Sequence, residues 1–301
     1  MAARGLKVLL DVPTGALAAG TLRAVKRLDR KRTADFAGRL MRKIGPLFKE
    51  HRLGRENLRL AFPEKSAAEI ETILDGVWDN LGRFAVEVAH FDEFHLAGLA
   101  PATANVITYP PDAAERSLLI MKRRRPIIGF AAHLANWELP ALGAKLLGAK
   151  SAVLFRRPNI DAVSELIVRL REPLMGELVP TGLDAPVRLA RLLQSGVHVG
   201  MLVDQHYTRG VEVTFFARKC LVNPLIAMLA RQTECPIHGI RFVRKPDGNS
   251  FWGEITDEIE PARDVNGRVE VAGTMQRITS VVEGWVREHP EQWLWLHRRW
   301  R

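Results

Sequence analysis

The sequence predicts an α/β fold in which a largely parallel, mixed sheet is flanked by helices. Short apolar runs of strand length alternate with longer stretches in which apolar residues recur at helical spacing. Strands that alternate with helices favour a parallel sheet that carries helices on both faces. The chain has 301 residues, of which 47% are apolar, so one large α/β domain can account for most of it.

The expected elements follow from the spacing of apolar residues. Residues 33–51 and 66–90 have the spacing of helices, and residues 273–288 predict a final long helix. The expected strands cover residues 117–121, 127–130, 151–155, 197–203, 237–244 and 250–255. The last two are predicted to form a hairpin that turns at residues 246–249, where Pro, Asp, Gly and Asn occur together.

The net charge of +10 lies entirely in the first fifth of the chain. Residues 1–60 hold 15 Lys and Arg against 5 Asp and Glu, which leaves 29 residues of each sign in residues 61–301. Anionic lipid headgroups attract a polybasic segment by roughly 1 kcal/mol per basic residue close to the surface. We therefore expect residues 1–60 to form a basic helical membrane-associating segment that precedes an α/β domain over residues 61–301.

Nucleic acid would also attract such a segment. However, no zinc finger, RNP-like aromatic motif or clear helix-turn-helix spacing accompanies it, so nucleic acid is not the expected partner. A solvated basic helix without a partner is the remaining alternative.

The apolar stretch near the N-terminus is too interrupted for a standard membrane span. Lys7, Asp11, Pro13 and Arg23 divide it, and its longest uncharged part, residues 12–22, is shorter than the roughly 20 residues that a spanning helix needs. We expect an interfacial or tilted anchor. A signal peptide is not expected, because Asp11 and Pro13 interrupt its apolar core and basic residues crowd the expected cleavage region.

The most informative motif joins a histidine to a carboxylate. The uncharged run over residues 127–132 is followed by His133 and, five positions later, by Glu138, with Asn136 as a suitable N-cap for the helix that follows. His133 would then lie beyond the carboxyl end of a strand, where open α/β sheets bind ligands. If Glu138 lies in the first helical turn, it can hold the imidazole as an oriented general base. The alternative is a structural histidine and a carboxylate that interacts only with the helix dipole.

A second candidate site follows the expected strand at 197–203. Asp204, Gln205 and His206 come directly after it, and two neighbouring strand ends could bring Asp204 close to His133. Read alone, the same residues are an ordinary loop opening.

Arginine pairs follow a third expected strand. Arg156 and Arg157 could bind a phosphate of a glycolipid headgroup or of a pantetheine arm, and Arg169 and Arg171 are similar candidates. Exposed arginines after a strand are also common without any ligand.

The sequence lacks the motifs of several other classes of enzyme and binding protein. The sequence has no G-x-S-x-G, H-E-x-x-H, G-x-G-x-x-G or P-loop, which argues against a serine hydrolase, a zincin and nucleotide binding. Its two cysteines, Cys220 and Cys235, form no C-x-x-C pair and suit a reducing compartment. No metal and no cofactor are expected, and base catalysis without a protein nucleophile remains.

The segment from His133 to Glu138 resembles the H-x4-D/E signature of the late acyltransferases of lipid A biosynthesis, the lauroyl/myristoyl acyltransferase family. Further segments agree with this family in the same order along the chain, at residues 56–64, 154–158, 203–206, 213–217 and 290–300. The last of these, dense in Trp and Arg, is the most specific. By composition its aromatic and cationic side chains suit either a membrane interface or a clamp onto the core.

The resemblance implies a glycerolipid-acyltransferase-like fold and a membrane-associated acyltransferase at the cytoplasmic face of the cell inner membrane. The acyl chain would move from acyl carrier protein to a hydroxyl of a lipid A precursor, without a covalent acyl-enzyme. His133 would act as the base and Glu138 would orient it. The residues expected to bind substrate are Asp204, Gln205, Asn136, Arg156, Arg157 and Arg171.

Two alternatives stay open at this point. An acyltransferase of the same fold could act on a glycerolipid or a mannosylated phosphoinositide, since H-x4-D/E is shared across those enzymes. A non-catalytic membrane or nucleic-acid binding protein could keep the scaffold, in which case His133→Ala would leave its activity intact.

Overall fold

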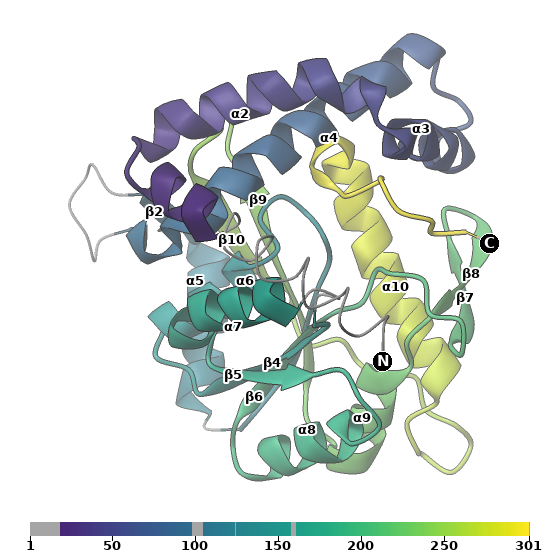
Figure 1. The fold of residues 1–301 in the computed structure, drawn as a ribbon. Coiled ribbons are helices and arrows are strands. Elements are labelled where there is room, and N and C mark those ends of the chain that lie inside the picture. Colours follow the sequence, from purple (N-terminus) through teal and green to yellow (C-terminus); the bar gives the residue numbers. More distant parts are fainter. Residues whose placement is uncertain (1–18, 98–104, 124, 158–160, 301) are drawn as a thin grey trace, which may run out of the picture.

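The structure is a computed structural model that describes residues 19–97, 105–123, 125–157 and 161–300 (Figure 1). The strands of the main sheet are β1 (Phe94–Leu96), β2 (Asn105–Thr108), β3 (Ile128–Ala131), β4 (Ser151–Phe155), β5 (Glu177–Pro180), β6 (His198–Leu202), β9 (Ile237–Arg244) and β10 (Phe251–Ile255). A separate hairpin consists of β7 (Val211–Phe215) and β8 (Arg218–Val222).

Helices surround the sheet. The α-helices are α2 (Arg30–Ile44), α3 (Lys49–Ala61), α4 (Ala67–Glu87), α5 (Pro111–Lys122), α6 (Leu139–Leu146), α7 (Asp161–Met175), α8 (Ala185–Gln194), α9 (Leu225–Thr233) and α10 (Val271–Glu288). Short 3-10 helices are η1 (Gly45–Leu47), η2 (Val88–Glu93) and η3 (Pro290–Gln292).

The eight-stranded sheet has the order β1-β2-β10-β9-β3-β6-β4-β5. All neighbouring strands are parallel except β9 and β10, which form the antiparallel hairpin predicted from the sequence. Figure 1 shows helices on both sides of the sheet. The predicted α/β fold with a largely parallel, mixed sheet is therefore confirmed, and β3 and β6 are neighbouring inner strands.

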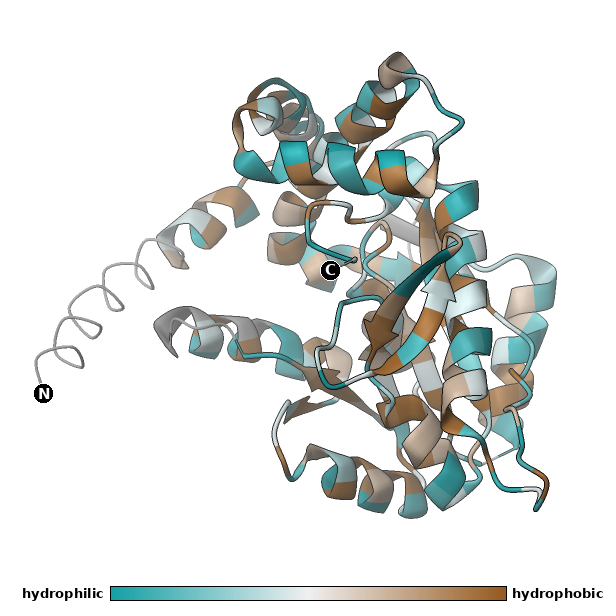
Figure 2. Cartoon of the chain, turned by 90° about the vertical axis from the view of Figure 1, so that its right-hand side faces the viewer, coloured by the Kyte–Doolittle hydropathy of each residue, from teal (hydrophilic) through white to brown (hydrophobic). Residues whose placement is uncertain are grey.

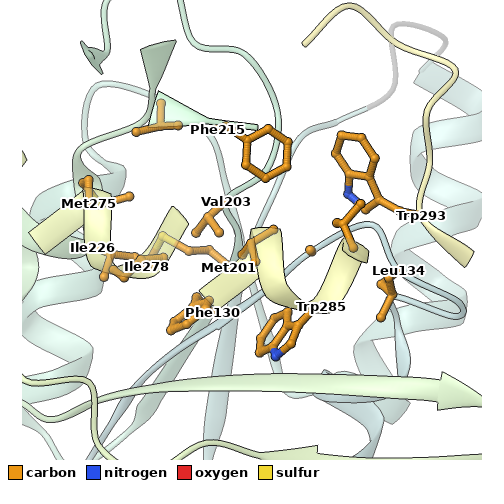
Figure 3. Packing of buried hydrophobic residues seen from close by; sticks show 14 of the residues in the cluster. Phe130, Leu134, Met201, Val203, Phe215, Ile226, Met275, Ile278, Trp285 and Trp293 are labelled. Atoms are coloured by element: carbon orange, nitrogen blue, oxygen red, sulfur yellow. The ribbon is translucent and has the colours of Figure 1, made fainter. Parts of the chain in front are cut away.

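Alternating residues of the central strands face different layers. Phe130 on β3 and Met201 on β6 point toward α10, where Phe130 stacks on Trp285 with ring centroids 5.6 Å apart (Figure 3). The strands are mainly hydrophobic in Figure 2, whereas the surrounding helices carry both hydrophobic and hydrophilic residues. The opposite face of the sheet is covered by α5, α6 and α7.

The strand expected at residues 117–121 is wrong, because these residues lie inside α5. Pro111 occupies the start of that helix, where its missing N–H costs nothing, and Asp112 lies in the first turn, where its charge suits the helix dipole. Ser117 Oγ donates to the carbonyl of Ala113 at 2.8 Å, as expected one helical turn away.

The helix expected over residues 33–51 is interrupted. Gly45 and Pro46 begin η1 between α2 and α3, and a Cβ on Gly45 would lie 2.2 Å from the Trp78 ring. Only glycine allows this close approach, which turns the chain at this point. The short strands β1, β2 and β5 and the β7–β8 hairpin were not predicted from the sequence.

The described part of the basic segment packs on α4 through α2. Arg83 of α4 binds Asp35 of α2 at 2.5 Å and Asp79 at 2.6 Å. A domain boundary at residue 60 falls inside α3, and the division into a membrane segment and an α/β domain stays a prediction.

Most of the interrupted apolar stretch expected as an anchor lies outside the described residues, which begin at residue 19. Within the described ranges, no helix combines the length and the apolar character needed to cross a bilayer.

Candidate active site

The carboxyl ends of β3 and β6 bring a histidine and an aspartate together. Ala131 pairs with Leu202 in register, and His133 and Asp204 each follow two residues later. His133 Nδ1 lies 2.8 Å from Asp204 Oδ1. Asp204 Oδ2 accepts from the His133 backbone N–H at 2.8 Å and from Trp293 Nε1 at 2.7 Å. The expected proximity of Asp204 and His133 is confirmed.

Asp204 remains ionised although it is only 1% exposed. Burial alone would raise its pKa, but the charge of His133 and the hydrogen bonds from its ring and backbone lower the pKa of Asp204 well below its usual range. A carboxylate only accepts hydrogen bonds, so the proton of a neutral His133 must sit on Nδ1. The lone pair is therefore on Nε2, which lies 3.3 Å from the Gln205 side-chain nitrogen.

The expected pairing of His133 with Glu138 requires a correction. The structure gives the hydrogen bond of the imidazole to Asp204, while Glu138 forms an ion pair with Arg171 of α7. Glu138 occupies the N-cap position of α6, and its backbone there is helical rather than extended. Burial raises the pKa of Glu138, and the nearby charges of Arg171 and His133 oppose this effect. The guanidinium partner explains why this carboxylate is turned toward α7.

The loop that connects His133 to Glu138 has a strained backbone. Ala135 has a φ of +47°, and its carbonyl accepts from Asn80 Nδ2 at 3.0 Å while its N–H donates to the Gln292 carbonyl at 2.8 Å. Leu134 forms a β-bridge with Trp293 of the C-terminal tail. Together these contacts hold Ala135 in a backbone conformation that is unfavourable for a residue with a Cβ.

Asn136 has a structural role in the loop between His133 and α6. It is fully buried, and its Nδ2 donates to Glu87 Oε2 at 2.8 Å. Its Oδ1 accepts from the Glu138 N–H at 3.2 Å, ahead of α6, so Asn136 is not the helix N-cap that the sequence predicted. Asn136 holds the loop in place and does not line the cavity described below.

A buried ion pair supports the same loop from below. Glu87 of α4 is 0% exposed and binds both terminal nitrogens of Arg244, which ends β9. Arg244 Nε also donates to Asn80 Oδ1 at 2.9 Å. This support was not predicted from the sequence. Its signal in the sequence is that Asn80 and Glu87 lie seven positions apart on the buried face of α4, which is otherwise made of apolar residues and glycine.

A cavity of about 690 Å³ begins at His133 and runs along the sheet beneath α5 and α6. Its mouth is polar and its deeper walls are largely apolar, as in pockets for elongated ligands. Mouth residues include His133, Glu138, Arg156, Arg157, Arg171, Gln205 and His206. Of the expected site residues, Asp204 lies behind His133 and supports it without lining the cavity. Arg156 and Arg157, which follow β4, are exposed at the rim.

The C-terminal tail is a clamp onto the core. Trp293 and Trp295 are almost fully buried and meet edge to face, with ring centroids 4.5 Å apart. Asn57 of α3 donates to the carbonyls of Trp295 and His297 at 2.8 Å each. Two conspicuous segments of the sequence, 56–64 and 290–300, thus meet around the site, and they leave these two tryptophans unable to reach a membrane.

In the part of the chain that the structure describes, neither the thiols nor a set of metal ligands forms a second centre. Cys220 and Cys235 are buried and free, and burial raises the pKa of the Cys220 thiol, which disfavours a nucleophilic role. Within the described residues, no group of three His, Cys, Asp or Glu side chains is placed to hold a metal ion.

Comparison with known proteins identifies the family of this chain. The chain is 24% identical over 254 residues to the lipid A biosynthesis palmitoleoyltransferase of Escherichia coli (strain K12), an alignment that covers 83% of this chain and 78% of that protein. It matches the lipid A biosynthesis acyltransferase of Shigella flexneri with the same identity and coverage. Residues 6–301 match the sequence profile of bacterial lipid A biosynthesis acyltransferases. The chain therefore belongs to the bacterial lipid A biosynthesis acyltransferase family.

Proposed function

We propose that this protein moves a fatty acyl chain from the thioester of acyl carrier protein to a hydroxyl of a lipid A precursor. The observation that carries the proposal is a histidine whose Nδ1 is fixed by the buried Asp204 and whose ring lines the mouth of a largely apolar cavity. Membership of the family and the names of its relatives support the lipid acceptor.

The reaction needs no protein nucleophile. His133 Nε2 takes the proton of the acceptor hydroxyl as the oxygen attacks the thioester carbonyl. The C–S bond then breaks, the imidazolium returns the proton to the departing thiolate, and an ester and a free thiol result. Asp204 holds the reactive tautomer and stabilises the imidazolium. Gln205 occupies Nε2 in the free protein and must yield that position to the hydroxyl.

The cavity suits the acyl chain of the donor. Burial of each CH₂ group contributes about 0.8 kcal/mol, so a largely apolar cavity along the sheet would favour a long chain. At the mouth, the exposed Arg156 and Arg157 would bind a phosphate of the pantetheine arm or of the glycolipid. Arg171, held by Glu138, adds a third guanidinium at the same rim.

We also propose that the protein works at the cytoplasmic face of the inner membrane, with α2 and η1 against the lipid. Phe36 and Leu47 are 61% and 83% exposed there. The exposed cations of α2 include Lys31, Arg32, Arg39 and Lys43. Apolar side chains within a basic helical surface are typical of interfacial binding to anionic lipid.

A vesicle assay tests this surface. Leu47→Glu should lower binding of the full chain to anionic vesicles at least about tenfold, because one buried leucine is worth more than 1.4 kcal/mol. Leu183→Glu, at a fully exposed leucine elsewhere, is the matched control. Equal binding of both variants would remove α2 and η1 from the interface.

The activity is tested with labelled acyl groups on acyl carrier protein and a lipid A precursor. His133→Ala should reduce the rate by on the order of 10² to 10⁴, the usual contribution of a positioned general base. Circular dichroism and vesicle binding must show that the variant is folded. Transfer to a glycerolipid instead of the lipid A precursor would make the acceptor wrong, and equal rates for wild type and His133→Ala would make the mechanism wrong.

A further inference from the structure

The cavity is bounded on one side by alternate residues of the central strands. Because neighbouring side chains of a strand point to opposite faces, Gly129 and Gly200 face the cavity while Phe130 and Met201 face α10 (Figure 3). The cavity wall therefore has rows, each made of residues paired in register across β3, β6 and β4.

The middle row is made of small residues. Gly129 pairs with Gly200, and Gly200 pairs with Val153. A Cβ placed on Gly200 would meet no atom within 4 Å, although this residue lies on an inner strand of an eight-stranded sheet. The space beside Gly200 is thus the cavity itself. At Gly129, by contrast, a Cβ would lie 3.2 Å from Ile240 Cδ1.

In the next row, Ile127 lies beside two polar residues, His198 and Ser151. His198 pairs in register with Ser151, and both line the cavity. The Ile127 N–H donates to His198 Nδ1 at 3.2 Å, which anchors the ring and leaves the proton on Nε2. Ser151 Oγ is buried and has no hydrogen-bond partner within the described residues. Hydrocarbon that reached this row would bury the Nε2–H group of His198 without an acceptor, so the row opposes the entry of the chain.

We propose that Gly200 and His198 set the length of the acyl chain that the cavity accepts: Gly200 keeps the path open, and the row of His198 and Ser151 ends it. The proposal rests on the proposed function, in which this cavity holds the donor's acyl chain. Strands rise about 3.3 Å per residue, so the rows of Gly129 and Ile127 lie roughly 13 Å and 20 Å from His133. A side chain at Gly200 would therefore shorten the path by about a third.

The test is a series of increasing size, Gly200→Ala, Gly200→Val and Gly200→Leu. The measured quantity is kcat/KM for thioester donors from decanoyl to octadecanoyl. Each methylene that loses its place in an apolar pocket costs about tenfold or more. For Gly200→Leu, we expect the ratio of the hexadecanoyl to the decanoyl rate to fall at least about 100-fold relative to wild type. The decanoyl rate itself should change by only a few-fold.

Gly284→Val is the matched control, because Gly284 is exposed on α10 and a Cβ there meets no atom within 4 Å. Its chain-length profile should equal that of wild type. A second variant, His198→Ala, removes this Nε2–H group and should move the preferred donor toward longer chains. The proposal is overturned if folded Gly200→Leu slows all donors equally, or if His198→Ala leaves the preferred length unchanged.

Direct binding separates this proposal from the proposed function. Titration with free dodecanoate and hexadecanoate measures occupancy of the cavity without any transfer. If wild type binds hexadecanoate and Gly200→Leu binds only dodecanoate, while neither transfers acyl groups, the length determinant stands and the acyltransferase function fails. If transfer occurs and Gly200→Leu keeps the profile of wild type, the function stands and the length determinant fails.

Discussion

Replacement of Asp204 by asparagine tests which carboxylate orients the catalytic histidine. In the structure Asp204 Oδ1 faces His133 Nδ1, and Oδ2 accepts from the His133 backbone and from Trp293. An asparagine satisfies those two donors only if its oxygen takes the place of Oδ2. Its NH₂ group then points at His133 Nδ1, which must become an acceptor.

This change moves the imidazole proton to Nε2 and removes the base. In a Ser-His-Asp triad the same substitution leaves the geometry intact and lowers kcat about 10⁴-fold through the wrong tautomer. At 1.36 kcal/mol per factor of ten, this corresponds to about 5.5 kcal/mol of transition-state stabilisation. We expect a loss of the same order for Asp204→Asn.

Glu138→Gln is the matched comparison. It leaves the contact between His133 and Asp204 intact and weakens the ion pair with Arg171. A hydrogen bond to a charged group is worth about 1.5–3 kcal/mol, so we expect a loss on the order of tenfold to 100-fold.

Both variants are measured as acyl transfer under single-turnover conditions, with the folded state checked by thermal unfolding. A loss for Glu138→Gln that equals or exceeds the loss for Asp204→Asn would refute the assignment and restore Glu138 as the orienting carboxylate.

Three further predictions concern the support of the site. Trp293→Phe removes one of the donors to Asp204 and should lower both kcat and Tm, since a hydrogen bond to a charged group is worth about 1.5–3 kcal/mol; unchanged values would show that the indole N–H is dispensable. Arg244→Met leaves Glu87 buried without its cation and should reduce the free energy of unfolding by about 3–5 kcal/mol in urea titrations, and a change under about 1 kcal/mol would contradict the ion pair's role. Because the folded state lowers the pKa of Asp204, its charge stabilises the fold above the pKa of an unfolded Asp, about 3.9, and this stability is lost as the pH falls through the lower folded value. The stability gap between wild type and Asp204→Asn should therefore be full at pH 7 and close toward pH 2, whereas a gap that does not depend on pH would speak against an ionised Asp204.

The amino-acid sequence determined the architecture and the location of the site. Apolar runs and helical spacing predicted the central strands, the β9–β10 hairpin and the final helix. The position of His133 and Asp204 after two apolar runs predicted their meeting, because carboxyl ends of parallel strands lie at one edge of a sheet. Local patterns failed at residues 117–121, where a short apolar run in a helix resembles a strand.

The tertiary structure alone decided which carboxylate holds the histidine. Spacing along the chain brings Glu138 within reach of His133, but Glu138 forms its ion pair with Arg171, which lies 33 residues further along the chain. Trp293, 89 residues from Asp204, donates a hydrogen bond to that aspartate. The walls of the cavity were equally out of reach of the sequence. They depend on the register that places Gly129, Gly200 and Val153 in one row, and register arises from the packing of the whole sheet rather than from any single strand.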